Sequence, residues 1–165
     1  MFREMRRKKQ LLSADESIEI LTNATSGVLA LSGDNDYPYA VPLSYVYDDG
    51  KIYFHSAKSG HKLDSLKRNS KASFCVIAQD EIVPEEYTTY FRSVIVFGTI
   101  HIIEDDKEKY DAIEKLAMKY APEDSAENRK NAVQKDWQPL CMMEMTIEHM
   151  TGKEAIELKR AKSES

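Results

Sequence analysis

A long apolar run is missing from this 165-residue sequence, and its absence excludes several classes of protein. No stretch approaches the roughly 20 apolar residues that a membrane-spanning helix needs. The first ten residues are basic but lack the apolar segment of a secretory signal. We therefore expect a cytoplasmic protein that does not contact membranes. A chain of this length fits one domain whose core needs no disulfides to hold it.

Cysteine is scarce, and the sequence gives no indication of a metal site. The two cysteines, Cys75 and Cys141, lie far apart, each within its own apolar stretch. This placement predicts two buried free thiols rather than a disulfide or a metal-binding pair. The four histidines show none of the spacings that are typical of zinc or iron ligands. We expect no bound metal.

The charge distribution and the missing motifs exclude further functions. The formal net charge is −5, and the basic residues near the start form only a short arm, interpreted as a solvated segment. We therefore expect no nucleic-acid partner. The G-x-S-x-G elbow of many hydrolases is absent, as are the G-x-G-x-x-G loop and the P-loop. Nucleophilic catalysis and the common nucleotide-binding folds have no support in the sequence.

Hydrophobic periodicity predicts an α+β protein. Six segments have the alternation or the short apolar run of a β-strand, and helices stand at the ends and in two gaps rather than in strict alternation with strands. This order indicates a six-stranded antiparallel barrel and argues against a doubly wound sheet. The expected strands are 27–32, 39–47, 51–56, 71–78, 93–104 and 140–150, and the expected helices are 14–24, one around 63–66, 107–120 and one from 124 or 125 to 135.

Three local signals refine this prediction. Ser13 and Glu16 have the spacing of a capping box at the start of the first helix. Pro42 interrupts a strand, so it requires a sheet edge, a bulge or a place where the ladder opens, because proline has no N–H to donate. Gly98 predicts a kink or bulge in the strand that contains it.

The junction between strand 51–56 and the following helix is a candidate anion site. A helix start offers unpaired backbone N–H groups and the positive end of a dipole. Ser59 adds a hydroxyl, Gly60 permits close approach, and His61 and Lys62 add positive charge. Junctions of this composition also occur where no anion binds. Trp137 is similarly open to two interpretations, either a core residue or a cover for a planar ligand.

Three segments in this order resemble one known group of proteins. The segments 39–47 (YAVPLSYVY), 52–57 (IYFHSA) and 60–63 (GHKL) are similar to the FMN-binding split-barrel superfamily of pyridoxamine-phosphate oxidase. Within it, the chain looks most like the nitroimidazole-resistance proteins. The resemblance covers residues 5–153, nearly the whole chain.

The resemblance implies a homodimer with two FMN sites at the subunit interface. The charge pattern and the absence of a linker predict one domain over 1–152, with a basic arm at 1–10 and a charged, flexible tail at 153–165. Ser93 and Trp137 are expected to come from the partner subunit. The implied cofactor contacts are Val41, Pro42, Leu43, Ser44, His55, Ser56, Ala57, Ser59, Gly60, His61, Lys62, Ser93 and Trp137.

The implied activity is that of an FMN-dependent oxidoreductase, similar to flavin reductases and nitroreductases, that acts on small acceptors. His55 and Tyr90 are the candidate proton donors. A true pyridoxamine-phosphate oxidase is disfavoured because the C-terminal Arg-x-His motif is absent. The alternatives on the same fold are a flavin-binding or sensing module without turnover and a haem-binding relative. Fold alone does not choose the substrate.

Overall fold

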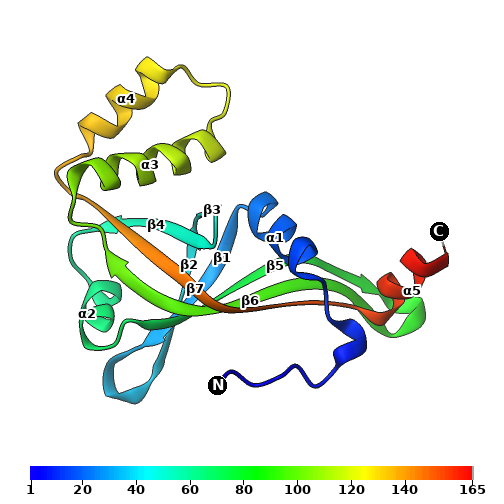
Figure 1. Ribbon diagram of the computed structural model, residues 1–165. Helices are drawn as coiled ribbons and strands as arrows, with labels where there is room; N and C mark the ends of the chain where they lie inside the picture. The colour runs from blue at the N-terminus through cyan, green and yellow to red at the C-terminus, as the bar shows by residue number, and fades with distance from the viewer. Residues whose placement is uncertain (165) are drawn as a thin grey trace.

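Alternating side chains build one antiparallel sheet in the computed structural model, which describes residues 1–164 (Figure 1). The sheet order is β2-β1-β5-β6-β7-β4-β3, and the sheet curls into a split barrel. The α+β fold predicted from the sequence is confirmed. The strands are β1 Ser26–Ser32, β2 Pro38–Ser44, β3 Val46–Asp48, β4 Lys51–Ala57, β5 Lys71–Val83, β6 Thr88–Ile102 and β7 Leu140–Glu154.

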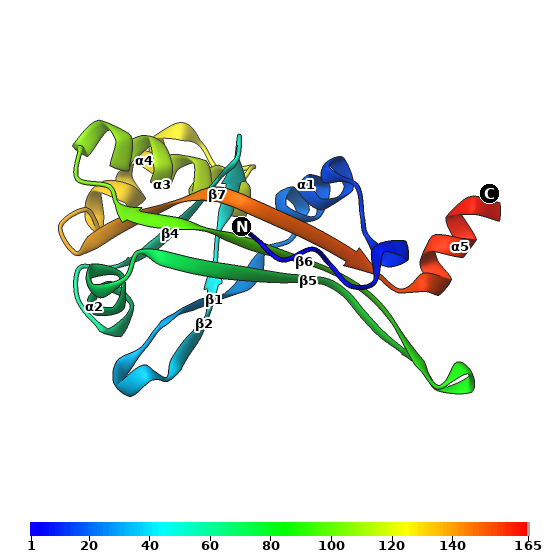
Figure 2. The same ribbon diagram turned by 60° about the horizontal axis from the view of Figure 1, so that its bottom comes forward.

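The helices pack at several places around the sheet. Helix α2 packs on β1, α3 packs on β4 and β7, and α4 packs on α3. Helix α1 contacts β3, β6 and β7. The β5–β6 hairpin and α5 project from the end of the molecule opposite α2 (Figures 1 and 2). The helices are α1 Ala14–Asn23, α2 His61–Arg68, α3 Asp106–Tyr120, α4 Ala126–Lys135 and α5 Ile156–Glu164.

The core divides into two clusters. The larger cluster fills the barrel, where Phe74 is fully buried and makes edge-to-face contacts with Phe54 and Tyr45 at ring-centroid distances of 5.1 and 4.9 Å. The smaller cluster joins α3, through Leu116, to the other face of β4 and β7. Ile52 and Phe54 of β4 pack in the barrel core, and Tyr53 packs toward α3 on the other face. Strand β4 is therefore held on both faces just before residues 55–57.

The sheet has seven strands rather than the predicted six because segment 39–47 does not form one strand. It divides at Tyr45 into β2, which pairs with β1, and β3, which pairs with β4. The Tyr45 side chain is fully buried, and its hydroxyl donates a hydrogen bond to the Leu21 carbonyl at 2.7 Å. The alternating pattern continues through the break, so periodicity does not reveal it.

The bulge predicted at Gly98 is confirmed. The register between β6 and β7 shifts between Phe97 and Gly98. A Cβ on Gly98 would collide with the Thr146 carbonyl oxygen, so the close approach of the two strands requires glycine. A second bulge lies in β5 between Ile77 and Gln79.

Three strands are at least three residues longer than predicted. Strands β5 and β6 extend toward each other into a long hairpin, and β7 continues to Glu154. The sequence predicts a charged, flexible tail over 153–165; the structure has the last two residues of β7 and helix α5 over residues 153–164, and residue 165 lies outside the described residues.

The two cysteines are free thiols, as predicted. Cys141 is buried, but Cys75 is only half-buried, because its side chain lies on the outer face of β5. Within residues 1–164, no helix is both long and apolar enough to cross a membrane. The same residues contain no cluster of three or more acidic, histidine or cysteine side chains arranged to hold a metal ion.

The first helix is tied to the last. The capping box is confirmed: the Ser13 hydroxyl accepts from the Glu16 N–H at 3.1 Å, and Glu16 accepts from the Ser13 N–H at 2.8 Å. Lys162 of α5 donates to the same Glu16 carboxylate at 2.7 Å and to Glu154 at 3.1 Å. The hydrogen bond from Lys162, followed by the one from Ser13, lowers the pKa of Glu16 to about 2.

We predict a specific acid sensitivity from this pair. A carboxyl whose pKa is lower in the folded state stabilises the fold above its ordinary pKa of 4.5, and this contribution is lost as the pH falls toward 2. Glu16→Gln should lower the free energy of unfolding at neutral pH by about 1 kcal/mol, the upper range for an exposed ion pair. It should also flatten the pH dependence between 4.5 and 2. Urea unfolding across this range is the measurement, and Glu19→Gln on the same helix is the control. Equal pH slopes in all three proteins would contradict the assignment.

Candidate functional site

Two open strand edges begin at the point where the sheet divides. Strand β2 pairs only with β1, and β3 pairs with β4 only over residues 51–53. Residues 54–57 of β4 therefore have a ladder partner on the β7 side alone. Strands β2 and β4 lie close to each other without pairing. Both edges present backbone N–H and C=O groups that are available to a polar, planar ligand.

Tyr45 holds this division in place. Burial raises the pKa of its hydroxyl, which is committed to Leu21, while Lys119 lies 4.1 Å above the centre of its ring. The Tyr45 N–H is itself bonded to the Tyr120 hydroxyl at 3.2 Å. Both the side chain and the backbone of Tyr45 are therefore held by hydrogen bonds at the residue where β2 ends and β3 begins.

The predicted contacts on β2 divide between the two faces of the strand. Val41 and Leu43 pack against the barrel core, whereas Pro42 is exposed and Ser44 is half-buried. Pro42 lies on an edge strand, which confirms one of the three positions that its sequence signal allowed. Because backbone groups alternate in direction, the Pro42 carbonyl and the Ser44 peptide groups face the open edge together.

The predicted contacts on β4 lie beyond the end of β3. Phe54 points into the core and is fully buried, so alternation turns His55 outward, where it is exposed. Ser56 is half-buried and Ala57 is exposed. These three residues pair across the ladder with Met142, Cys141 and Leu140 of β7.

The start of α2 has no side-chain cap. Gly60 is the N-cap residue, with φ of 122°, and no side chain accepts from the first-turn N–H groups. Ser59 precedes the cap and is exposed, while Lys62 in the first turn is half-buried. Leu63 and Leu66 are buried and hold the helix on the core. The N–H groups of the first turn thus face outward, as an anion-binding helix start requires.

His61 has a structural partner that the sequence analysis missed. Its ring stacks on Tyr39 at a centroid distance of 3.9 Å, and Nε2 lies 3.7 Å from an Asp34 carboxylate oxygen. Arg68, at the other end of α2, donates to the second Asp34 oxygen at 2.7 Å. Asp34 therefore fixes both ends of α2 to the β1–β2 connection. Nothing local in the sequence links Asp34 to a helix 27 residues later, so only the fold reveals this role.

The structure does not bring Ser93 or Tyr90 near His55 within one chain. Ser93 pairs with Lys153, whereas His55 pairs with Met142, so the two lie eleven residues apart along β7, about 35 Å of strand. Tyr90 is further along the hairpin, where its hydroxyl donates to Glu86 at 2.8 Å.

Trp137 lies in the connection between α4 and β7 and is half-buried. The Lys109 ammonium lies 4.1 Å above the centre of its ring and donates to the Trp137 carbonyl at 3.1 Å. Burial lowers the pKa of Lys109. Since Leu140 pairs with Ala57, Trp137 stands only a few residues beyond the end of β4.

Comparisons with known proteins agree with this architecture. The sequence profile of a family described as pyridoxamine 5'-phosphate oxidase matches residues 13–154. A structure described as that of a candidate 5-nitroimidazole antibiotic resistance protein from Bacteroides thetaiotaomicron has a TM-score of 0.72 and 22% identity, over 87% of this chain and 85% of that one. None of the curated proteins compared with the chain matches it.

Two further similar structures are those of proteins described as binding FAD. An FAD-binding protein from Mesorhizobium loti has a TM-score of 0.64 and 28% identity, over 88% of this chain and 97% of that one. An FAD and haem binding protein from Mycobacterium smegmatis has a TM-score of 0.72 and 20% identity, over 89% of this chain and 73% of that one.

We predict that Gly60→Ala destabilises the protein without any clash. A Cβ at this position meets no atom within 4 Å, so the cost is entirely that of a φ of 122° for a residue with a side chain. The expected loss in the free energy of unfolding is about 1–3 kcal/mol. Denaturant unfolding measures it, with Ser59→Ala as the control that should change little. A variant as stable as the parent would show that the helix start has another backbone conformation.

Proposed function

The chain belongs to the pyridoxamine 5'-phosphate oxidase family, and from that premise we propose that it is an FMN-dependent oxidoreductase acting on small acceptors, nitroaromatic compounds included. The observation that carries the proposal is the uncapped start of α2 beside the open edges of β2 and β4. This combination offers a phosphate site and a backbone edge for a planar ring within one surface.

The helix start fits the phosphate of FMN. The first-turn N–H groups and the dipole of α2 favour a dianion, and Lys62 adds a charge-assisted hydrogen bond. Gly60 leaves the backbone open on the side where a Cβ would otherwise stand. The stack of His61 on Tyr39 and its contact with Asp34 keep the helix start in position.

The strand edges fit the ring. The Pro42 carbonyl and the Ser44 backbone groups provide acceptors and a donor for the polar edge of an isoalloxazine, and residues 55–57 border the chain that links ring to phosphate. When bound, FMN supplies the transfer of electrons; the protein binds the cofactor, orients it and restricts water.

His55 is the proposed proton donor. Its imidazole is exposed beside the open edge of β4, where an N–H can reach a substrate lying over the ring. Tyr90 can act as a proton donor to the substrate only if it comes from a partner subunit. Its hydrogen bond to Glu86 raises the pKa of its hydroxyl.

A homodimer completes the proposed site. Val28, Cys75 and Ile95 are aligned across the ladder on the outer face of β1, β5 and β6, and Phe97 lies on the same face of β6. Val28, Ile95 and Phe97 are each close to 40% exposed, which is unusual for neighbouring apolar side chains of a folded sheet. A second copy packed on this face would bury the apolar row. It would also let Ser93 and Tyr90 of one chain serve the flavin of the other.

We predict tighter binding of FMN than of riboflavin, because riboflavin lacks the phosphate, and than of FAD, because FAD must also fit a second nucleotide. Lys62→Ala should weaken FMN binding by about 1.5–3 kcal/mol and leave riboflavin binding unchanged. Fluorescence titration of the flavin-free protein measures both affinities, and Lys67→Ala at the far end of α2 is the control. Equal affinity for riboflavin and FMN would show that the start of α2 does not bind the phosphate. A Soret band in the purified protein would favour a haem-binding relative instead.

We predict that the protein sediments as a homodimer at micromolar concentration. Phe97→Glu should shift it toward monomer and release FMN together with the partner, because a charge in the apolar row must be desolvated on association. Met118→Glu, exposed on α3, should leave the dimer intact. A monomer that retains FMN fully would contradict the shared site.

We predict that the chemically reduced protein is reoxidised by a nitroaromatic acceptor faster than free reduced FMN, because the site holds the acceptor over the ring. His55→Ala should slow this step about 100-fold without releasing FMN. Stopped-flow absorbance measures the rate, with His101→Ala on β6 as the control. Reoxidation no faster than that of free flavin would identify a flavin-binding module without turnover.

A further inference from the structure

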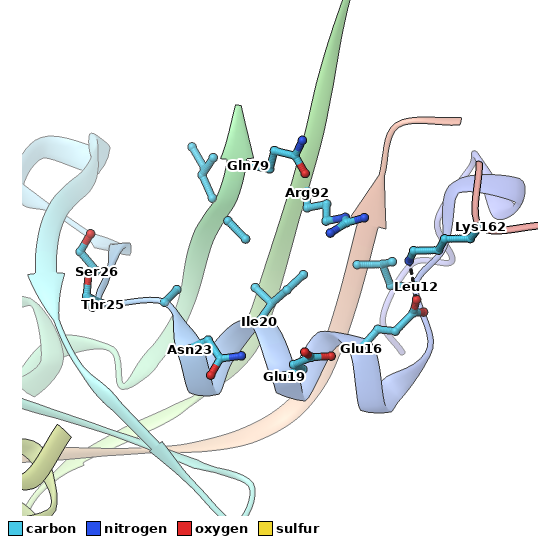
Figure 3. A pocket seen from close by; sticks show the side chains of 13 residues that line it. Leu12, Glu16, Glu19, Ile20, Asn23, Thr25, Ser26, Gln79, Arg92 and Lys162 are labelled. Atoms are coloured by element: carbon cyan, nitrogen blue, oxygen red, sulfur yellow. Dashed lines mark hydrogen bonds and ion pairs between the residues drawn. The ribbon is translucent and has the colours of Figure 1, made fainter. Parts of the chain in front are cut away.

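A cavity of about 620 Å³ lies between α1, β5 and β6, closed at one side by α5 (Figure 3). This volume falls within the range that small-molecule sites occupy. None of its lining residues belongs to β2, β4 or α2. Arg92, in its wall, pairs with Glu154, twelve residues and about 40 Å along β7 from the partner of His55. The cavity is thus separate, within one chain, from the surface proposed for FMN.

Arg92 is held in a fixed orientation toward this cavity. Its Nε donates to Glu154 at 3.1 Å, and Glu154 is only 1% exposed. Lys162 donates to the same carboxylate, so Glu154 is fully committed. Among residues 1–164, the two terminal nitrogens of Arg92 have no hydrogen-bond partner, and its side chain is 35% exposed. A guanidinium anchored through Nε presents its remaining donors end-on to a carboxylate without further loss of side-chain freedom.

The other charges around the cavity are nearly balanced. Glu16 accepts hydrogen bonds from Lys162 and from the Ser13 N–H, and its pKa is lowered to about 2. Its carboxylate therefore stays ionised and is already bonded to these two partners. Glu19 is exposed on the next turn of α1 and has no partner within residues 1–164. Figure 3 shows Glu16, Glu19 and Asn23 along α1, with Arg92 and Gln79 across the cavity. One negative charge on a ligand meets Arg92, and a second would face Glu19.

Part of the remaining wall is apolar, and the rest is polar and uncharged. Ile20 of α1 and Ile77 of β5 line the cavity, and Ile77 is 65% exposed. The bulge between Ile77 and Gln79 interrupts the alternation of β5, so Ile77 and its neighbour Ala78 both line the cavity. An apolar body can therefore be covered while an acidic group reaches Arg92.

We propose that this cavity binds small organic monocarboxylates with an apolar body, that Arg92 holds the carboxylate, and that Glu19 excludes dianions. The selectivity rests on an attractive and a repulsive group placed on opposite walls. The site goes beyond the proposed flavin chemistry, and it adjoins the proposed dimer face, because Ile77 in its wall is the ladder partner of Ser93.

The test uses the whole 165-residue chain as purified, with benzoate as the monocarboxylate and terephthalate as the matched dianion. Isothermal titration calorimetry should give saturable benzoate binding, at least tenfold tighter than that of terephthalate or inorganic phosphate. Arg92→Met should weaken benzoate binding at least tenfold. Lys159→Met, which removes a cation of α5 that does not line the cavity, should leave it unchanged. Flavin content, read from the absorption spectrum of each sample, separates this result from the fate of the flavin site.

Two exposed substitutions on α1 keep the proposal testable if Arg92→Met folds poorly. Glu19→Gln should reduce the preference for benzoate over terephthalate at least fivefold, and Asn23→Asp should weaken benzoate binding about threefold. Urea unfolding checks that both variants remain folded. The proposal is overturned if benzoate does not saturate, if phosphate binds as tightly as benzoate, or if neither α1 variant changes the affinities.

Discussion

The buried Tyr45 side chain separates the two strand edges on which the candidate site is built. Its hydroxyl is bonded to Leu21 of α1, its ring packs on Phe74, and its N–H is bonded to Tyr120 of α3. Three separate elements thus converge on one residue where the chain leaves β1 and joins β4. The chain changes ladder partner at this position, from β1 before it to β4 after it, and β2 and residues 54–57 of β4 are each left with one open edge. The polar surface beside α2 exists because the ladder is interrupted there.

The features that the sequence predicts correctly are those with local causes. The capping box needs only Ser13 and Glu16, three residues apart. Pro42 has no N–H to donate, so it lies on an edge strand. Gly98 lies at the bulge because two strands approach there too closely for a Cβ. The start of a helix soon after β4 is likewise a matter of a few adjacent residues. Each of these signals survives in the fold because no distant contact competes with it.

The features that sequence reasoning misses depend on residues far apart in the chain. The break at Tyr45 follows from partners on α1 and α3, and the anchoring of α2 follows from Asp34, which pattern alone marks only as a turn. Helix α5 looks like a solvated tail by composition. In the structure, Lys162 joins a buried Glu154 to Glu16 at the start of the chain. Two ion pairs of Lys162 thus connect this charged segment to residues far away in the sequence.

The open edges also pose a risk that the sequence of β2 reduces. An unpaired strand edge can add a strand from another molecule and aggregate. Pro38 and Pro42 are four residues apart, so their missing N–H groups lie on the same side of the strand. The ladder with β1 runs without interruption from Ser44 to Pro38, so that side is the open edge. The edge therefore cannot complete a regular ladder with a foreign strand, yet it keeps the carbonyls and the few N–H groups that a planar ligand needs. The two prolines that protect the strand from other chains thus leave it accessible to a small molecule.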